Sequence, residues 1–128
     1  MWLRHARIGA LSWQESADGA RLSAQHDGYR RLPDGVVHAR SVRFERQRRR
    51  FVIEDQLTCK AGHDVQRFWH FGENCRVEES ADGVTVRSGA KTVRLIFDSP
   101  SRAARNLYRG SEQPLSGWVS RRFDVKQP

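Results

Sequence analysis

The segment Gln25-His26-Asp27-Gly28-Tyr29 brings an imidazole and a phenol close together in the sequence. Both groups can donate and accept hydrogen bonds. At the end of a short strand they could line a groove that binds a substrate. An edge-strand turn with Tyr29 half buried would give the same pattern, so both interpretations stay open. We take His26 and Tyr29 as candidate substrate-binding residues.

A second set of reactive side chains is expected on one face of a hairpin formed by residues 36–44 and 50–57. If the hairpin turns between Arg46 and Gln47, antiparallel pairing fixes which side chains lie opposite each other. The expected pairs are Val42 with Phe51, Arg40 with Ile53, and His38 with Asp55. With His70 from a following strand, His38 and Asp55 could form a zinc site. A histidine hydrogen-bonded to an aspartate beneath a core is the commoner arrangement, and we assign no metal ligand.

Arginines are concentrated around the turn of the same hairpin. They are Arg40, Arg43, Arg46, Arg48, Arg49 and Arg50, and the nearest acids are Glu45 and Glu54. The chain has 23 Lys and Arg residues against 15 Asp and Glu residues, a formal net charge of +8. This charge favours polyanions: acidic polysaccharide, nucleic acid or an anionic membrane surface. A solvated basic surface is the alternative. We take Arg40, Arg48, Arg49 and Arg50 as candidate substrate-binding residues.

Motifs of several enzyme classes are absent from the sequence. It contains no G-x-S-x-G, no G-x-x-x-x-G-K-[ST] and no H-E-x-x-H. Cys59 and Cys75 form neither a C-x-x-C pair nor a disulfide framework, and neither has a histidine next to it. We therefore expect two free thiols and no nucleophilic cysteine.

The elements that must position these residues are predicted to be strands, because the chain shows period-two alternation and no helical stripe. The expected strands cover residues 7–14, 20–26, 36–44, 50–57, 65–71, 76–78, 84–87, 92–98, 105–108 and 118–123. About ten short strands predict an all-β fold, an antiparallel β-sandwich. The expected core contains Val42, Phe51, Ile53, Phe68, Val86, Leu95 and Phe97. The pentapeptide Glu-Ser-Ala-Asp-Gly occurs at residues 15–19 and 79–83, which we interpret as reused turn chemistry.

Length and composition agree with one folded domain over residues 1–128. Hydrophobic residues make up 38% of the chain and charged residues 30%, a balance that favours a packed core over disorder. No apolar run approaches the roughly 18 residues that span a bilayer. The N-terminus lacks the apolar stretch of a signal peptide. As written, the chain is expected to have no membrane segment and no export signal.

Short motifs follow one another along the chain in a characteristic order. They are His26-Asp27-Gly28-Tyr29, Val37-His38-Ala39-Arg40, Ile53-Glu54-Asp55, Gly62-His63, Trp69-His70-Phe71 and Gly117-Trp118-Val119-Ser120. Over residues 4–125 this series resembles the C-terminal part of the heparinase II/III-like polysaccharide lyases. The resemblance implies an antiparallel β-sandwich. In the family, this sandwich and an N-terminal (α/α) toroid, which carries a catalytic Tyr, form the cleft where acidic polysaccharide is cut by β-elimination.

The sequence departs from the family at the motifs that carry its chemistry. Family members have a His-x-His-x-Asp motif and then an Asn preceded by His, which supply catalytic and zinc-binding groups, and this sequence is expected to begin beyond them. The resemblance therefore carries over no catalytic or metal role. His38, Asp55, His63 and His70 are instead interpreted as strand-organising residues. No cofactor is expected, although zinc is possible in the full-length family.

The expected function is that of the β-sandwich part of a polysaccharide lyase, supporting substrate binding and domain packing. Its expected partners are acidic polysaccharide and the missing N-terminal toroid domain of a parent protein, and the resemblance implies a parent often periplasmic or secreted in bacteria. The alternative is a stand-alone carbohydrate-binding or protein-interaction module, in which exposed aromatic rings stack on sugars beside arginines. A nucleic-acid binder ranks last, because no RNP-like aromatic pattern, zinc finger or recognition helix is present.

Overall fold

The computed structural model describes residues 6–98, 104–123 and 125–128. These ranges contain eleven strands and no helix, and all strand pairs are antiparallel. The all-β, antiparallel fold is therefore confirmed. Within the same ranges, no helix is long and apolar enough to cross a membrane. The chain divides into two compact units, unit 1 (Met1–Gln66) and unit 2 (Arg67–Pro128), and the single-domain organisation stays a prediction.

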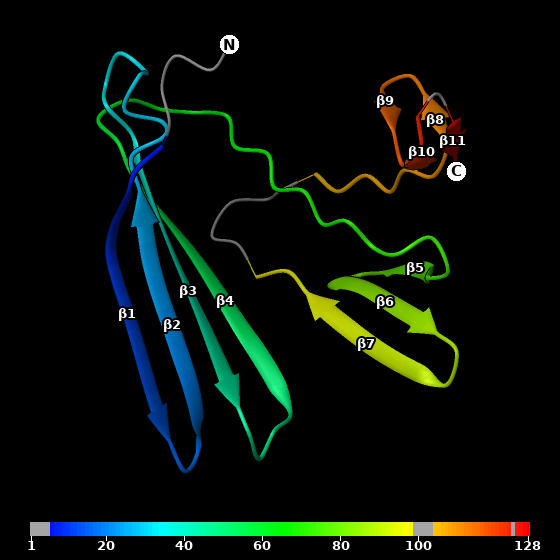
Figure 1. Ribbon diagram of the computed structural model, residues 1–128, viewed down its shortest axis with the longest axis horizontal. Coiled ribbons are helices and arrows are strands. Elements are labelled where there is room, and N and C mark those ends of the chain that lie inside the picture. Colours follow the sequence, from blue (N-terminus) through cyan, green and yellow to red (C-terminus); the bar gives the residue numbers. More distant parts are fainter. Residues whose placement is uncertain (1–5, 99–103, 124) are drawn as a thin grey trace. The chain divides into compact units, whose positions relative to one another are not determined.

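Unit 1 is built on a four-stranded sheet in which each strand pairs with the next one along the chain (Figure 1). Its strands are β1 (Ile8–Ser16), β2 (Gly19–His26), β3 (Val37–Glu45) and β4 (Arg50–Thr58). Side chains alternate between the two faces along each strand, so cross-strand partners share a face. One such row consists of Trp13, Leu22, Val42 and Ile53. The same face continues to the paired residues His26 and His38, so it ends in polar side chains.

The hairpin of β3 and β4 does not have the register that the sequence analysis assumed. Glu45 pairs with Arg50, which leaves residues 46–49 as the loop. The observed pairs are Phe44 with Phe51, Val42 with Ile53, Arg40 with Asp55, and His38 with Leu57. The expected register is thus wrong by two residues. A two-residue shift keeps every side chain on its face, so the face was predicted correctly although its pairs were not.

The cause of the shift is the position of the turn, whose centre lies one residue later than expected, between Gln47 and Arg48. Loops of four residues in hairpins are usually built around a type I turn. Here the amide of Arg49 donates to the carbonyl oxygen of Arg46 at 3.2 Å, which closes the turn. Arg49 itself has a φ of 48°, in the left-handed region. The run of arginines contains no glycine or asparagine to mark that position in the sequence.

The two Glu-Ser-Ala-Asp-Gly segments form the same turn in both units. In unit 1, Gly19 pairs with Ser16 and also with Glu45 on the third strand. The amide following that third strand donates to the carbonyl of the turn aspartate, Arg46 to Asp18 in unit 1 and Phe97 to Asp82 in unit 2, at 2.9 Å in each case. The two turns therefore share their contact with the third strand of the sheet as well as their sequence.

Both turn glycines are required by the close approach of that third strand. A Cβ at Gly19 would lie 1.9 Å from the carbonyl oxygen of Phe44, and one at Gly83 would lie 1.8 Å from that of Leu95. Such distances are far inside van der Waals contact, so any side chain would push the third strand away.

Unit 2 contains a three-stranded sheet and two short hairpins. The sheet has the order β5 (Arg76–Ser80), β6 (Gly83–Ser88) and β7 (Lys91–Ile96). The hairpins pair β8 (Ser111–Glu112) with β9 (Leu115–Ser116), and β10 (Val119–Arg122) with β11 (Val125–Gln127). Val84 and Val86 lie on the central strand β6 and are buried. Sheets of four and three strands are suitable layers for the expected sandwich.

The expected core is confirmed only in part. Val86 is buried, whereas Val42, Ile53, Leu95 and Phe97 are half-buried. The prediction that Phe51 and Phe68 belong to the core is wrong, because 66% and 67% of their surface is exposed. Phe51 lies next to the turn on the edge strand β4. Its ring centroid is 4.9 Å from that of Phe44, the neighbouring residue on β3.

Two expected strands, at residues 65–71 and 105–108, are also wrong, since both segments are irregular. Side chains rather than a ladder tie the second of these regions to its surroundings. Arg105 donates to the carbonyl oxygens of Ser80 and Ala81, and Arg109 donates to those of Glu73 and Cys75. The alternation of residue types in 105–108 predicted a strand, but it could not show that this segment has no neighbouring strand to pair with.

Candidate functional site

The predicted residues His26, Tyr29 and Arg40 lie together at one end of the unit 1 sheet. His26 ends β2 and pairs with His38 near the start of β3, and the connection between these strands, residues 27–36, carries Tyr29. These side chains line a pocket of about 380 Å³. Its other lining residues are Ile8, Leu11, Ala24, Gln25 and His38. The pocket therefore joins an apolar wall from β1 and β2 to a polar wall of imidazole, phenol and guanidinium groups.

A chain of hydrogen bonds organises the polar wall. The amide of Gly28 donates to Nδ1 of His26 at 3.2 Å. Nε2 of His26 lies 3.0 Å from Nδ1 of His38, and Nε2 of His38 lies 2.7 Å from Oδ1 of Asp55. A backbone amide can only donate, so Nδ1 of His26 must accept and its proton must be on Nε2. Nε2 of His26 then donates to Nδ1 of His38, which must accept. The proton of His38 is therefore on Nε2, which donates it to Asp55.

This arrangement leaves the two imidazoles poorly suited to proton transfer. All four of their ring nitrogens have a hydrogen-bond partner, and each ring fits the chain only as the neutral Nε2-protonated tautomer. A general base needs a nitrogen lone pair that can reach the substrate proton. His26 can instead contribute the surface of its ring to the pocket.

Asp55 ends the chain and also holds Arg40. Nε and one terminal nitrogen of Arg40 donate to the two carboxylate oxygens of Asp55 at 2.7 and 3.0 Å, a bidentate pair. Chiefly the hydrogen bond from Arg40, and then that from His38, lower the pKa of Asp55 from 3.8 to about 2, although burial opposes the shift. The hydrogen bond to Asp55 likewise raises the pKa of Arg40. Both groups are therefore charged at neutral pH.

Tyr29 packs against both imidazoles. Its ring centroid lies 5.3 Å from that of His26 and 6.5 Å from that of His38, with the rings tilted. The residue is 42% exposed, so part of the ring remains accessible. Tyr29 is therefore exposed rather than half-buried, and it lines the pocket.

The other predicted residues, Arg48, Arg49 and Arg50, lie in and beside the β3–β4 turn, far along the sheet from the pocket. From His38 to Glu45, β3 extends about 23 Å at roughly 3.3 Å per residue. Glu45 forms ion pairs with Arg43, Arg48 and Arg50. The hydrogen bond from Arg50 is the main cause that lowers the pKa of Glu45. One carboxylate cannot neutralise the five arginines of residues 43–50, so this arginine turn stays cationic.

Of the three residues considered for zinc, His38 and Asp55 lie in unit 1 and His70 lies in unit 2. His38 and Asp55 meet, but Asp55 already binds Arg40. His70 belongs to unit 2, where its ring stacks on that of Phe68 at 6.5 Å. Sequence reasoning found Arg40, but it did not connect His26 to His38. Only the β2–β3 register reveals that link.

Comparison with known proteins supplies one result about identity. Residues 2–128 match a family described as "Heparinase II/III-like, C-terminal". Neither the curated proteins nor the solved structures include a match to the chain. The family match covers essentially the whole sequence, both units included.

Proposed function

Since the chain belongs to the heparinase II/III-like C-terminal family, we propose that it is the β-domain of a polysaccharide lyase and helps to place an acidic polysaccharide. The observation that carries this proposal is the pocket in which Tyr29 and Arg40 flank a closed hydrogen-bond chain. Binding, rather than catalysis, is the role that engaged imidazoles support.

Tyr29 and Arg40 offer the two kinds of contact that an acidic sugar needs. The accessible part of the Tyr29 ring can stack on the C–H face of a pyranose. The guanidinium of Arg40 uses two N–H groups on Asp55 but has five in all. Its side chain is 46% exposed, so further N–H groups can reach a uronate carboxylate. Asp55 holds the guanidinium in place for this contact.

The arginine turn provides a second, weaker contact along the same sheet. Arg48 is 69% exposed and Arg50 is 50% exposed, so both are accessible to a bound chain. Exposed ion pairs contribute only about 0 to 1 kcal/mol each, and salt screens them. We therefore expect weak binding that depends on several arginines and decreases with ionic strength.

Retention on a column of immobilised uronate-rich or sulfated polysaccharide, eluted with a salt gradient, tests this function. The variant Arg48→Ser/Arg49→Ser/Arg50→Ser is expected to elute at lower salt than the wild type, with little change in melting temperature. A matched control removes three exposed arginines of unit 2, Arg76, Arg87 and Arg94, by the same substitution. If the two triple variants elute together, retention reports net charge alone and the arginine turn has no binding role.

The pocket is tested separately with Tyr29→Ala and Tyr29→Phe. Stacking depends on the ring, so Tyr29→Ala should elute earlier than the wild type, whereas Tyr29→Phe should retain most of the binding. Unchanged elution of Tyr29→Ala would remove the pocket from the proposal. Binding by the isolated chain as strong as that of a whole lyase would instead favour the stand-alone carbohydrate-binding module.

A further inference from the structure

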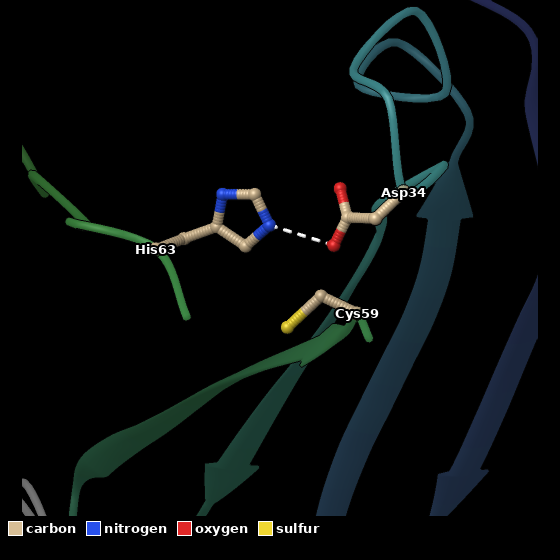
Figure 2. A group of neighbouring side chains, drawn as sticks. All are labelled: Asp34, Cys59 and His63. Atoms are coloured by element: carbon tan, nitrogen blue, oxygen red, sulfur yellow. Dashed lines mark hydrogen bonds and ion pairs between the residues drawn. The ribbon is translucent and has the colours of Figure 1, made fainter. Parts of the chain in front are cut away.

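A second group of side chains with metal-binding chemistry lies in the loops of unit 1 (Figure 2). Asp34 precedes β3, Cys59 directly follows β4, and His63 comes four residues later. Since Val37 pairs with Thr58, the register of the sheet places the segments before β3 and after β4 side by side. One potential ligand atom from each of the three residues lies within 4.8 Å of the others.

Asp34 is held firmly in this position. Its Oδ2 accepts hydrogen bonds from the amides of Lys60 and Ala61, both at 3.2 Å, and lies 2.8 Å from Nε2 of His63. The loop that carries Cys59 and His63 is thereby tied to the carboxylate. Such an arrangement fixes two of the three side chains before any ligand binds.

The other oxygen of the same carboxylate indicates that a partner is missing. Oδ1 of Asp34 is buried and accepts no hydrogen bond from the residues that the structure describes. A buried polar atom without a partner costs about 1 to 3 kcal/mol, so native proteins rarely leave one. A cation bound by Oδ1, or by both carboxylate oxygens, would remove this cost.

The donor set selects the cation. Calcium and magnesium prefer oxygen ligands throughout, whereas a thiolate, an imidazole and a carboxylate together suit zinc. In a tetrahedral zinc site the ligand atoms lie about 3.5 Å apart. The three potential ligand atoms lie within 4.8 Å of one another, so they would have to move closer together by about 1 Å. Rotation of the exposed Cys59 and His63 side chains can provide this movement.

We propose that Asp34, Cys59 and His63 bind one Zn²⁺ ion, with the fourth position open to water. Binding breaks the S–H bond of Cys59 and forms a Zn–S bond, and the thiol proton passes to solvent. A nitrogen of His63 and an oxygen of Asp34 provide the other two protein ligands. None of the three residues lines the pocket that contains Tyr29 and Arg40. None of the three belongs to the His-x-His-x-Asp motif.

Titration of the whole chain with Co²⁺, followed by competition with Zn²⁺, tests the site. Cobalt bound to a thiolate gives a sulfur-to-metal charge-transfer absorption, so this band reports ligation by cysteine. The matched variants are Cys59→Ser and Cys75→Ser, since Cys75 is the other free cysteine and lies in unit 2. We expect the band in the wild type and in Cys75→Ser, and its loss in Cys59→Ser.

Calorimetry should give one zinc per chain, with affinity at least about tenfold lower in Cys59→Ser and in His63→Gln. Circular dichroism of the metal-free variants shows that each is folded before it is titrated. Absence of the band from the wild type, its persistence in Cys59→Ser, or a stoichiometry of one zinc per two chains would overturn the proposal.

Discussion

Replacing Asp55 by asparagine tests whether the hydrogen-bond chain at the pocket stabilises unit 1. The carboxylate receives Arg40 at 2.7 and 3.0 Å and His38 at 2.7 Å, and its side chain is 18% exposed. Its pKa falls from 3.8 to about 2, and at about 1.4 kcal/mol per pKa unit this corresponds to roughly 2.5 kcal/mol. Arg40 is 46% exposed, and solvent screening reduces the value to about 1 to 2 kcal/mol.

The pH dependence follows from the direction of the shift. A carboxyl group with a lowered folded-state pKa stabilises the protein above its unfolded pKa, and this stabilisation is lost as the pH falls through the folded value. Near neutral pH, Asp55→Asn should therefore lower the free energy of unfolding by about 1 to 2 kcal/mol. The difference from the wild type should disappear between about pH 4 and about pH 2, because protonated aspartate resembles asparagine.

Urea unfolding, followed by circular dichroism and by tryptophan fluorescence over this pH range, provides the measurement. Asp64→Asn removes an exposed carboxylate from the same unit and serves as the control, with an expected change below about 0.5 kcal/mol. A loss in Asp55→Asn that persists at about pH 2, or one no larger than in the control, would refute the reasoning.

Three further predictions follow from the same structure. In ¹⁵N spectra at neutral pH, His26 and His38 should both be protonated on Nε2 and not on Nδ1, and a protonated Nδ1 in either ring contradicts the chain of hydrogen bonds. Arg49→Gly should raise the free energy of unfolding by about 0.5 to 1 kcal/mol because it relieves a left-handed residue, whereas an equal gain in Arg49→Ala would exclude that cause. The purified chain should release no unsaturated uronate from heparin, heparan sulfate or alginate, and a steady rise in its absorbance would show that a base is present.

The strands were predictable where alternation and turn residues agree. Both Asp-Gly hairpins were located from the sequence, because Asp-Gly between alternating segments is a hairpin signal. The structure adds that each glycine faces a backbone carbonyl that leaves no room for a Cβ. The β3–β4 register was not predictable, since five arginines around the turn give no residue that marks its centre. Phe68 was placed in the core because of its hydrophobic type, but in the structure it lies in an irregular segment.

The pocket was predictable only as separate residues. His26 and Tyr29 are neighbours in the sequence, so their proximity needed no knowledge of the fold. The link to His38 depends on a β2–β3 register set across a ten-residue connection, which no local pattern specifies. Asp34 and Cys59 were missed for a similar reason, since 24 residues separate them and only the pairing of β3 with β4 brings them together.

The sequential strand order of unit 1 has a consequence for how the sheet forms. Every strand pairs with the one before or after it, and the three connections have two, ten and four residues, so their closure costs little entropy compared with pairing of distant segments. Proteins whose contacts are local in sequence fold faster than proteins whose strands pair with segments far away in the sequence. During synthesis all four strands are complete once Thr58 has emerged, while unit 2 is still inside the ribosome or untranslated. The sheet that carries the pocket can therefore be assembled before unit 2 has left the ribosome.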